Sequence, residues 1–169
     1  MKTALTLLLL CMTFLSGIPS PTEDSKISFT FESKDITGTI GDIQSESEID
    51  LSQLENSKIK GSVSVSSLET GNFLRDGHLM WEKYFNRSDY PRIYFESTSI
   101  TPTKEASYTV LGNLTIKGIS KPVSFTAVKK GDRIKITGSI YTSDWDISIE
   151  EDRTENKVSI TMNLKIEEL

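Results

Sequence analysis

Apolar and polar residues alternate along most of the chain after residue 26. The clearest run is residues 158–166, in which Val158, Ile160 and Met162 are separated by single polar residues. A period of two places alternate side chains on opposite faces of a β-strand, so each such run predicts a strand with one apolar face. Similar runs predict strands at 27–31, 36–40, 43–51, 58–67, 92–100, 107–117, 122–129 and 133–142.

The connections between these runs indicate how the strands associate. Most are short and turn-like, as at Gly131-Asp132, which predicts an antiparallel, all-β fold. Strands with one apolar face form either a sandwich or a barrel. Glycines in the middle of strands, which permit sharp coiling, favour the barrel, and they are Gly38, Gly61, Gly112 and Gly138. We therefore expect an antiparallel β-barrel of about eight strands, whose interior can hold side chains or one ligand.

The segment 68–89 interrupts the alternation and predicts a short helical insert. Asn72 or Asp76 is a suitable N-cap for this helix, and Tyr90-Pro91 ends the segment because the residue before a proline avoids the helical region. A second interruption, at 101–105, predicts a loop. The apolar residues that can share one side of the helix are Leu79, Trp81 and Phe85.

Residues 1–20 have the composition of a secretory signal peptide. Lys2 precedes the apolar stretch Ala4–Leu15, which is too short to span a bilayer as a stable helix. We expect this leader to be removed, and an uncleaved membrane anchor is the alternative. The remaining residues, 21–169, have the length of one domain. Cys11 is the only cysteine, so removal of the leader would also remove any disulfide or zinc-thiolate chemistry.

The charge and the polar residues argue against several classes of function. The net charge of −5 is spread along the chain without a basic stripe, so no nucleic-acid partner is expected. His78 is the only histidine, and there is no Gly-x-Ser-x-Gly pattern for a nucleophile. Acidic residues between Asp144 and Glu155 have the spacing of a calcium loop, but Ile149 stands where that loop needs glycine. We expect no metal, no cofactor and no enzymatic activity.

Two motifs in the middle of the chain resemble the YceI-like family. The first is Arg75-Asp76-Gly77-His78-Leu79, followed by Tyr84-Phe85 and Tyr90-Pro91. The second is Gly112-Asn113-Leu114-Thr115-Ile116-Lys117-Gly118, followed by Pro122. The resemblance covers most of residues 21–169. It implies a lipocalin-like barrel that holds a polyisoprenoid or similar lipid in an apolar tunnel, and export to the bacterial periplasm or out of the cell.

Three departures from the family pattern bear on the ligand. The usual histidine near the end of the first strands is missing. In the element at 143–148, Trp145 and Asp146 replace the usual Phe and Gly, and Met80-Trp81-Glu82-Lys83 replaces small residues after the first motif. We expect the bulk of Trp81 and Trp145 to narrow the mouth of the tunnel.

The resemblance and the apolar faces together predict a lipid-binding protein. The expected ligand is a polyisoprenoid, quinone or acyl chain, held in the barrel for carriage, storage or sequestration. The alternative is a non-enzymatic structural or stress-related interaction domain with a filled core. Transient membrane contact and a dimer are left open.

The polar residues of the insert are expected to contact one another. We expect Arg75, Asp76 and His78 to form a hydrogen-bonded knot that fixes the insert, with a head-group contact by Arg75 as the functional alternative. The residues expected to bind the ligand are Phe29, Phe31, Val63, Val65, Phe73, Leu74, Arg75, His78, Leu79, Phe85, Phe95, Leu114, Ile116, Phe125, Ile140 and Trp145.

Overall fold

The computed structural model describes residues 27–50 and 52–165, so the expected leader at 1–20 lies outside the described residues. Within that part, the chain forms β-strands, one α-helix and several short 3-10 turns. The strands are β1 (Ile27–Phe31), β2 (Ile36–Ile40), β3 (Gln44–Ser45), β4 (Lys60–Ser64), β5 (Arg92–Lys104), β6 (Ser107–Ile116), β7 (Ile119–Lys130), β8 (Arg133–Tyr141) and β9 (Lys157–Lys165). The helix is α1 (Phe73–Leu79), and the 3-10 turns are η1 (Glu32–Lys34), η2 (Leu54–Asn56), η3 (Val65–Ser67), η4 (Thr142–Trp145) and η5 (Arg153–Asn156).

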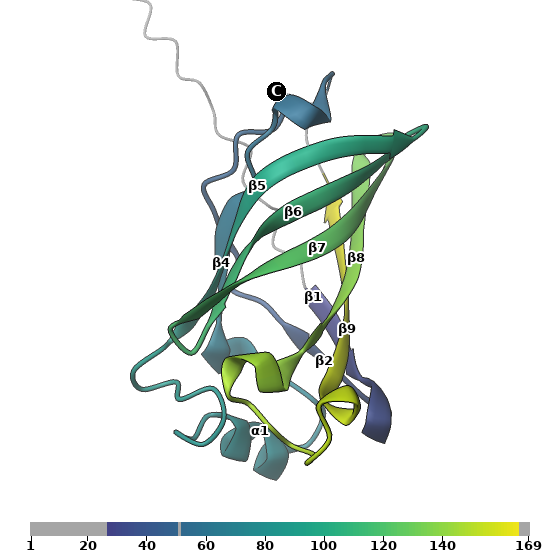
Figure 1. Cartoon of the computed structure of the whole chain (residues 1–169). Helices are drawn as coiled ribbons and strands as arrows, with labels where there is room; N and C mark the ends of the chain where they lie inside the picture. Colours follow the sequence, from purple (N-terminus) through teal and green to yellow (C-terminus); the bar gives the residue numbers. More distant parts are fainter. Residues whose placement is uncertain (1–26, 51, 166–169) are drawn as a thin grey trace, which may run out of the picture.

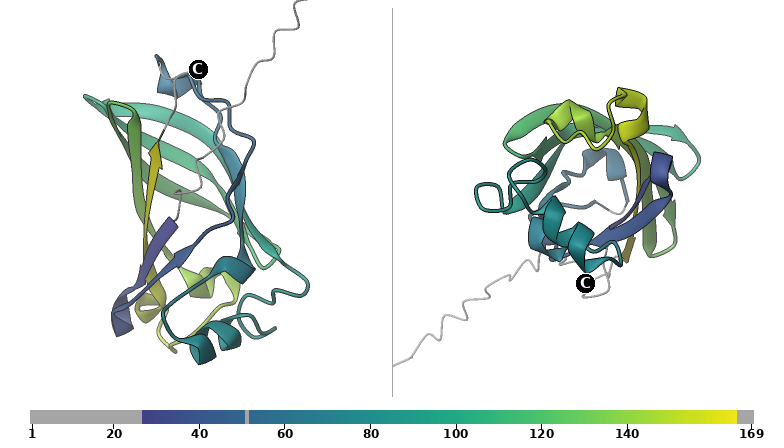
Figure 2. Two further views of the ribbon diagram at one scale, coloured as in Figure 1. Left: turned by 180° about the vertical axis from the view of Figure 1, so that it is seen from behind. Right: turned by 90° about the horizontal axis from the view of Figure 1, so that it is seen from below.

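All nine described strands belong to one antiparallel sheet with the order β2-β1-β9-β8-β7-β6-β5-β4-β3. Its two outer strands, β2 and β3, are joined only by residues 41–43, and so short a link spans no more than about 15 Å. The sheet must therefore curl until its outer strands approach each other. Figure 1 shows this curvature, and the right-hand view of Figure 2 shows the strands as a ring. The predicted all-β, lipocalin-like architecture with one short helix is confirmed.

The two edges of the sheet meet along residues 36–69, here called the seam. Strand β2 pairs with β1 on one side, and on the other Thr39 exchanges two backbone hydrogen bonds with Glu69, of 2.8 and 2.9 Å. The chain then continues into β3, which pairs with β4. A single bridge between Glu48 and Lys58 extends this pairing. Short contacts on alternate sides, not a continuous ladder, therefore close the barrel.

Arg92, the first residue of β5, fastens the seam with its side chain. Its guanidinium donates to the Asp42 carboxylate (2.9 Å) and carbonyl (2.6 Å), and also to the Ser62 hydroxyl (2.8 Å). Asp42 lies in the link between β2 and β3, and Ser62 lies in β4. One cation thus joins the two edges of the sheet.

Two predicted boundaries are wrong. The run 43–51 does not form a long strand: only β3 is a strand, because this polar run offers few apolar side chains to pack against the core. The loop expected at 101–105 is instead the end of β5, which continues to Lys104. Pro102 is tolerated there because β4 pairs only with residues 92–96, so the missing N–H of Pro102 falls on the edge that β4 leaves uncovered.

The segment between η4 and η5 packs beneath the end of the barrel. The Trp145 side chain is 2% exposed, and its indole N–H donates a 3.2 Å hydrogen bond to the Leu114 carbonyl. Asp146 has a φ of 57°, a left-handed conformation that glycine adopts most readily and that aspartate tolerates. Asn156, which is fully buried, accepts hydrogen bonds from the N–H groups of Ile149 and Glu150 and holds this segment.

Helix α1 lies at one end of the barrel (Figures 1 and 2). The Asn72 side chain accepts a 3.0 Å hydrogen bond from the Arg75 N–H, which confirms Asn72 as the N-cap. Leu79 and Phe85 pack against the core, but Trp81 points outward, so the prediction that all of them share one side is wrong. No helix in the described ranges has the length and apolar character needed to cross a bilayer.

Candidate functional site

The interior of the barrel holds a cavity of about 480 Å³. Inward-facing residues of β1, β2 and β4 to β9 form its wall, and α1 contributes residues at one end. The alternation selects these residues: in β1, Ile27, Phe29 and Phe31 line the cavity, while Ser28 and Thr30 do not. The volume lies in the range of about 300–1,000 Å³ that is usual for ligand sites. The middle of the barrel is therefore hollow.

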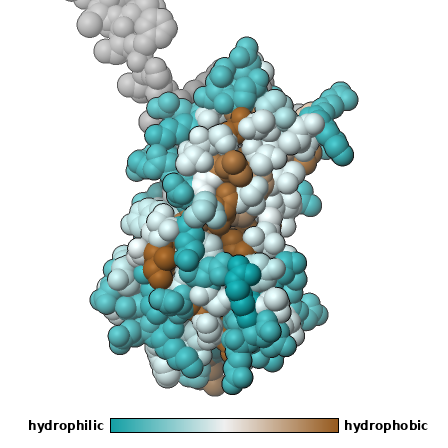
Figure 3. All heavy atoms as spheres, in the orientation of Figure 1, coloured by the Kyte–Doolittle hydropathy of each residue, from teal (hydrophilic) through white to brown (hydrophobic). Residues whose placement is uncertain are grey.

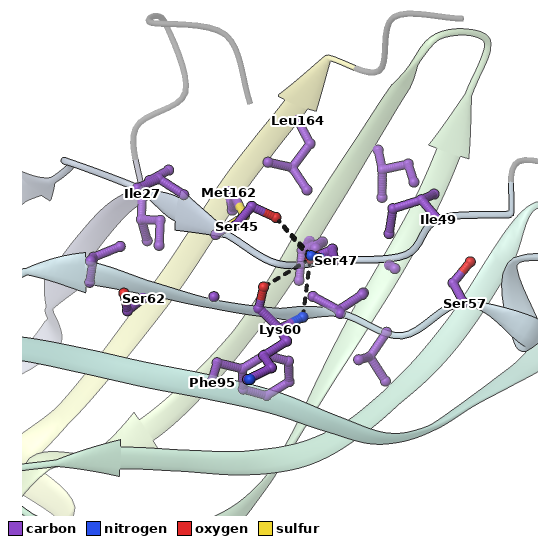
Figure 4. A pocket seen from close by; sticks show the side chains of 18 of the residues that line it. Ile27, Ser45, Ser47, Ile49, Ser57, Lys60, Ser62, Phe95, Met162 and Leu164 are labelled. Atoms are coloured by element: carbon purple, nitrogen blue, oxygen red, sulfur yellow. Dashed lines mark hydrogen bonds between the residues drawn. The ribbon is translucent and has the colours of Figure 1, made fainter. Parts of the chain in front are cut away.

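A second cavity, of about 190 Å³, adjoins the first near β3 and β4 (Figure 4). Ile27, Phe95 and Ile136 line both cavities, so the two lie side by side in the barrel interior. The polar groups here are engaged with one another. The Ser45 hydroxyl donates to the Ser47 hydroxyl, which in turn donates to the Lys60 carbonyl, each over 3.0 Å. These hydroxyls hold β3 against β4.

Two pairs of phenylalanine and glycine explain why the aromatic wall leaves the middle empty. A Cβ atom on Gly112 would lie 2.5 Å from the Phe95 ring, and one on Gly138 would lie 2.4 Å from the Phe125 ring. Each ring therefore lies over a glycine of the neighbouring strand and close to the sheet. A side chain at either glycine would push the ring towards the cavity. The mid-strand glycines thus set the width of the hollow as well as the curvature of the wall.

Polar atoms of the larger cavity gather at its α1 end. Arg75 is the charged residue among the described residues that line it, and Thr70, His78 and Tyr84 supply further polar atoms. The Arg75 guanidinium donates to the Thr70 hydroxyl (2.7 Å) and carbonyl (2.8 Å). The Asp76 carboxylate accepts from the N–H and the hydroxyl of the same threonine. The predicted knot therefore exists between Arg75, Asp76 and Thr70.

His78 takes no part in this knot, contrary to the prediction. It lies at the cavity mouth on an exposed stretch of α1, and its ring is 4.4 Å from that of Trp81. The reason is helical geometry: Arg75 and Leu79 lie four residues apart on the inward face, which turns His78 partly to solvent. A hydrogen-bonded base partner, which a catalytic histidine needs, does not accompany it among the described residues.

Most residues predicted to bind the ligand line the larger cavity. Alternation identified those on the strands, and the motif resemblance identified those on the insert. Alternation also marks Ile36, Ile40 and Ile160 as inward-facing, and these lining residues were missed although the signal was present. Thr70 and Tyr84 carried no such signal. The predicted residues that line the cavity are Phe29, Phe31, Val63, Arg75, His78, Leu79, Phe85, Phe95, Leu114, Ile116, Phe125 and Ile140.

The other predicted residues, Val65, Phe73, Leu74 and Trp145, line neither cavity. Val65 belongs to η3, where the alternation of β4 ends, and it is buried outside the hollow. Phe73 and Leu74 lie on the outer face of α1. The expected narrowing of the mouth is also wrong, because Trp145 is buried in the core and Trp81 is exposed on the outside.

Carboxylates of the calcium-like run are engaged in structural contacts. Asp144 forms an ion pair with Arg153 at 2.7 Å, and the hydrogen bond from this guanidinium lowers the pKa of Asp144. Glu150 pairs with Lys34, and Asp152 caps η5. Within residues 27–50 and 52–165, no three or more His, Cys, Asp or Glu residues are grouped as metal ligands would be.

Comparison with solved structures shows the same architecture in several bacterial proteins. BcnA of Burkholderia cenocepacia has a TM-score of 0.73 at 21% identity, covering 83% of this chain and 94% of that one. A YceI protein of Campylobacter jejuni has a TM-score of 0.69 at 21% identity, covering 79% and 86%. A domain of Saccharophagus degradans described as polyisoprenoid binding has a TM-score of 0.57 at 14% identity, covering 86% and 94%. At these identities the likeness shows the fold.

Sequence comparison identifies the family. A UPF0312 protein of Photorhabdus laumondii is 34% identical over 95 residues, which are 56% of this chain and 49% of the relative. A UPF0312 protein of Azotobacter vinelandii is 30% identical over 90 residues, or 53% and 47%. The chain thus spans about half the length of the curated relatives it matches. The model of the YceI-like domain matches residues 21–167, and the chain therefore belongs to the YceI-like family.

Proposed function

We propose that this protein binds a long apolar lipid, such as a polyisoprenoid, quinone or acyl chain, inside the barrel and carries or sequesters it. The observation that carries the proposal is the apolar cavity of about 480 Å³ in the barrel interior. Each methylene group that leaves water for such a site contributes about 0.8 kcal/mol. A long chain can therefore bind tightly without a covalent or metal-mediated contact. The polyisoprenoid-binding description of the Saccharophagus degradans domain supports this choice of ligand class.

In this proposal the ligand binds with its polar head group at the α1 end of the cavity. Arg75 lines the α1 end, and its Nη1 atom has no hydrogen-bond partner among the described residues, whereas Nε and Nη2 contact Thr70. The unused N–H groups suit an oxygen-bearing head group. The apolar tail then extends along the wall towards Ile136, which lines both cavities.

Binding without catalysis is part of the same proposal. An enzyme acting on a lipid needs a titratable side chain that is held by a partner and directed into the cavity. In the larger cavity, the titratable residues among the described ones are Arg75, which the knot holds, His78, whose ring lies 4.4 Å from that of Trp81, and Tyr84. The leader expected at residues 1–20 supports a location outside the cytoplasm.

Native mass spectrometry of purified protein tests the proposal directly. Geranylgeraniol and palmitate are added from ethanol, and we expect a one-to-one complex with at least one of them. Ile136→Trp should abolish uptake because Ile136 lines both cavities. Lys135→Trp is the matched control, since Lys135 is the exposed neighbour on the same strand. Circular dichroism checks that both variants fold.

Two results would contradict the proposal. One is the absence of uptake of either probe by the unmodified protein. The other is equal uptake by Ile136→Trp and Lys135→Trp, which would place the lipid outside the hollow. The alternative of an interaction domain that binds no lipid would gain support only from the first result.

A further inference from the structure

Helix α1 and the turn after it expose large apolar side chains to solvent. Phe73 is 87% exposed, Leu74 70% and Trp81, in the turn, 60%. Leu74 and His78 are four residues apart on the helix, and the His78 ring lies 4.4 Å from that of Trp81. Arg75 and Leu79 occupy the adjoining side and line the cavity, which His78 also borders. The helix thus has an apolar face towards solvent in addition to the one towards the barrel.

The position of this face ties it to the cavity. The helix that carries Phe73 and Leu74 also supplies Arg75 and His78 to the polar end of the larger cavity. A grouped, exposed apolar surface of this kind marks an interaction site. Because it borders the end of a lipid-sized hollow, the partner that fits is the medium from which an apolar ligand would come.

The charge around α1 distinguishes between kinds of lipid surface. Residues 69–92 contain the acidic residues Glu69, Asp76, Glu82 and Asp89 and the basic residues Arg75, Lys83, Arg87 and Arg92, which gives 4 − 4 = 0, whereas the whole chain carries −5. The segment 142–156 packs at the same end, since Tyr84 and Phe85 share a core with Trp145 and Ile147, and its six acidic residues and one basic residue give 1 − 6 = −5. This end is therefore acidic. An acidic surface repels an anionic bilayer, so a zwitterionic bilayer is the one that its exposed aromatic rings suit.

We propose that the exposed apolar surface formed by Phe73 and Leu74 of α1 and by Trp81 of the turn after it inserts into the interface of a zwitterionic lipid bilayer. This contact brings the α1 end of the cavity to the membrane surface. The reason for docking rests on the proposed lipid-binding function. The contact with the bilayer is independent of that function, because none of the three side chains lines either cavity. Trp81 sits at the depth of the head groups, where its ring is buried and its N–H remains in contact with water.

Co-sedimentation of the full chain with phosphatidylcholine vesicles tests this docking. We expect Phe73→Ser combined with Leu74→Ser to lower the partition coefficient about tenfold or more, because two large apolar side chains no longer enter the bilayer. Leu111→Ser combined with Val128→Ser is the matched control, since both residues are 43% exposed and lie on the outer wall in β6 and β7. Any contribution of residues 1–26 is the same in each variant.

Tryptophan fluorescence reports where the contact forms. Trp81 is exposed and Trp145 is buried, so vesicles should shift the emission of Trp81 to the blue, and brominated lipid should quench it. Trp81→Phe should remove both signals. This readout identifies the α1 end even if another part of the chain also touches the vesicle.

The outcomes separate this proposal from the lipid-binding function. Loss of vesicle binding in the α1 variant, with uptake of geranylgeraniol from ethanol unchanged, supports docking. Equal vesicle binding by the α1 and control variants, or an unchanged Trp81 spectrum, overturns docking and leaves ligand binding intact. Vesicle binding that depends on phosphatidylglycerol overturns the zwitterionic choice. Failure of uptake from ethanol by the unmodified protein would contradict the proposed function alone.

Discussion

The wall of the barrel, β5 to β9, and its seam, residues 36–69, enclose the same hollow by different means. Wall strands are nine or more residues long, and β8 pairs with β9 from end to end. The seam contains a strand of two residues and depends on polar contacts such as those of Arg92. A change to an inward side chain of the wall should therefore alter stability and cavity together. A change in the seam should loosen closure and leave the wall's lining in place.

The largest expected effect comes from removing a wall aromatic. Phe125→Ala should lower the free energy of unfolding by about 3–4 kcal/mol, because it deletes a buried ring that packs over Gly138 and against Phe95. Urea unfolding measures this change. Leu111→Ala, on the outer face of the neighbouring strand, should lower the free energy of unfolding by much less. Equal losses in the two variants would show that inward packing does not distinguish the faces of the wall.

A smaller loss is expected from the seam. Arg92→Ala should lower the free energy of unfolding by about 2 kcal/mol, because several hydrogen bonds from a side chain only 16% exposed are lost. Lys58→Ala, which removes an exposed ion pair with Glu96, should cost less than about 1 kcal/mol. Hydrogen exchange should rise at the Thr39 and Glu69 amides in the Arg92 variant and stay unchanged in β6. Uniform exchange throughout the sheet would contradict a separate seam.

Substitution of glycines gives another contrast between the wall and the seam. Gly112→Ala should cost about 1.5 kcal/mol, because its Cβ would meet the Phe95 ring at 2.5 Å and the Glu96 carbonyl at 2.6 Å. It should also weaken lipid uptake, since the ring moves into the hollow. Gly41→Ala in the seam, where a Cβ has no heavy atom within 4 Å, should be near neutral. Similar stabilities for the two variants, measured by urea unfolding, would rule out the glycine as the cause of the hollow's width.

The smallest effect concerns pH at the end of the wall. The hydrogen bond from Arg153 lowers the pKa of Asp144 below its ordinary value of 3.8 in the folded protein. The pair therefore stabilises the fold above that ordinary value, and the contribution is lost as the pH falls through the folded pKa. Asp144→Asn should cost about 0.5 kcal/mol at pH 7. The difference in the free energy of unfolding between this variant and the unmodified protein should shrink as the pH falls below 3.8, and urea unfolding at a series of pH values measures it. A difference that stays constant with pH would contradict a stabilising ion pair.

The wall is also the part of the molecule that the sequence describes well. Along β9, Val158, Ile160 and Met162 alternate with polar residues, and the structure pairs them in register with β8. Burial on one face imposes that period, so the pattern is visible in the residues themselves. The error at 101–105 arose because Pro102 was taken as a break, whereas only the partner strand decides whether its missing N–H matters.

The seam and the insert were less predictable, for a physical reason. The closing contacts there join residues far apart in the chain, such as Arg92 to Asp42 and Thr39 to Glu69. The alternation of apolar and polar residues along a strand does not reveal such contacts. Phe73 and Leu74 were expected to bind the ligand, but helical geometry around the inward Arg75 places them outside. Leu79 of the same helix does line the cavity, whereas Val65, at the end of the predicted strand 58–67, does not.

The three-residue link between β2 and β3 has a consequence for behaviour at high concentration. In most open sheets the first and last strands present unpaired N–H and C=O groups, on which a neighbouring molecule can add a strand and begin fibril growth. Here the backbone of Thr39 in β2 is hydrogen-bonded to Glu69 at the opposite edge of the chain's own sheet, and Glu46 and Glu48 bond to Lys60 and Lys58. These backbone contacts, together with the ion pair between Arg92 and Asp42, occupy part of the edge on which aggregation could start.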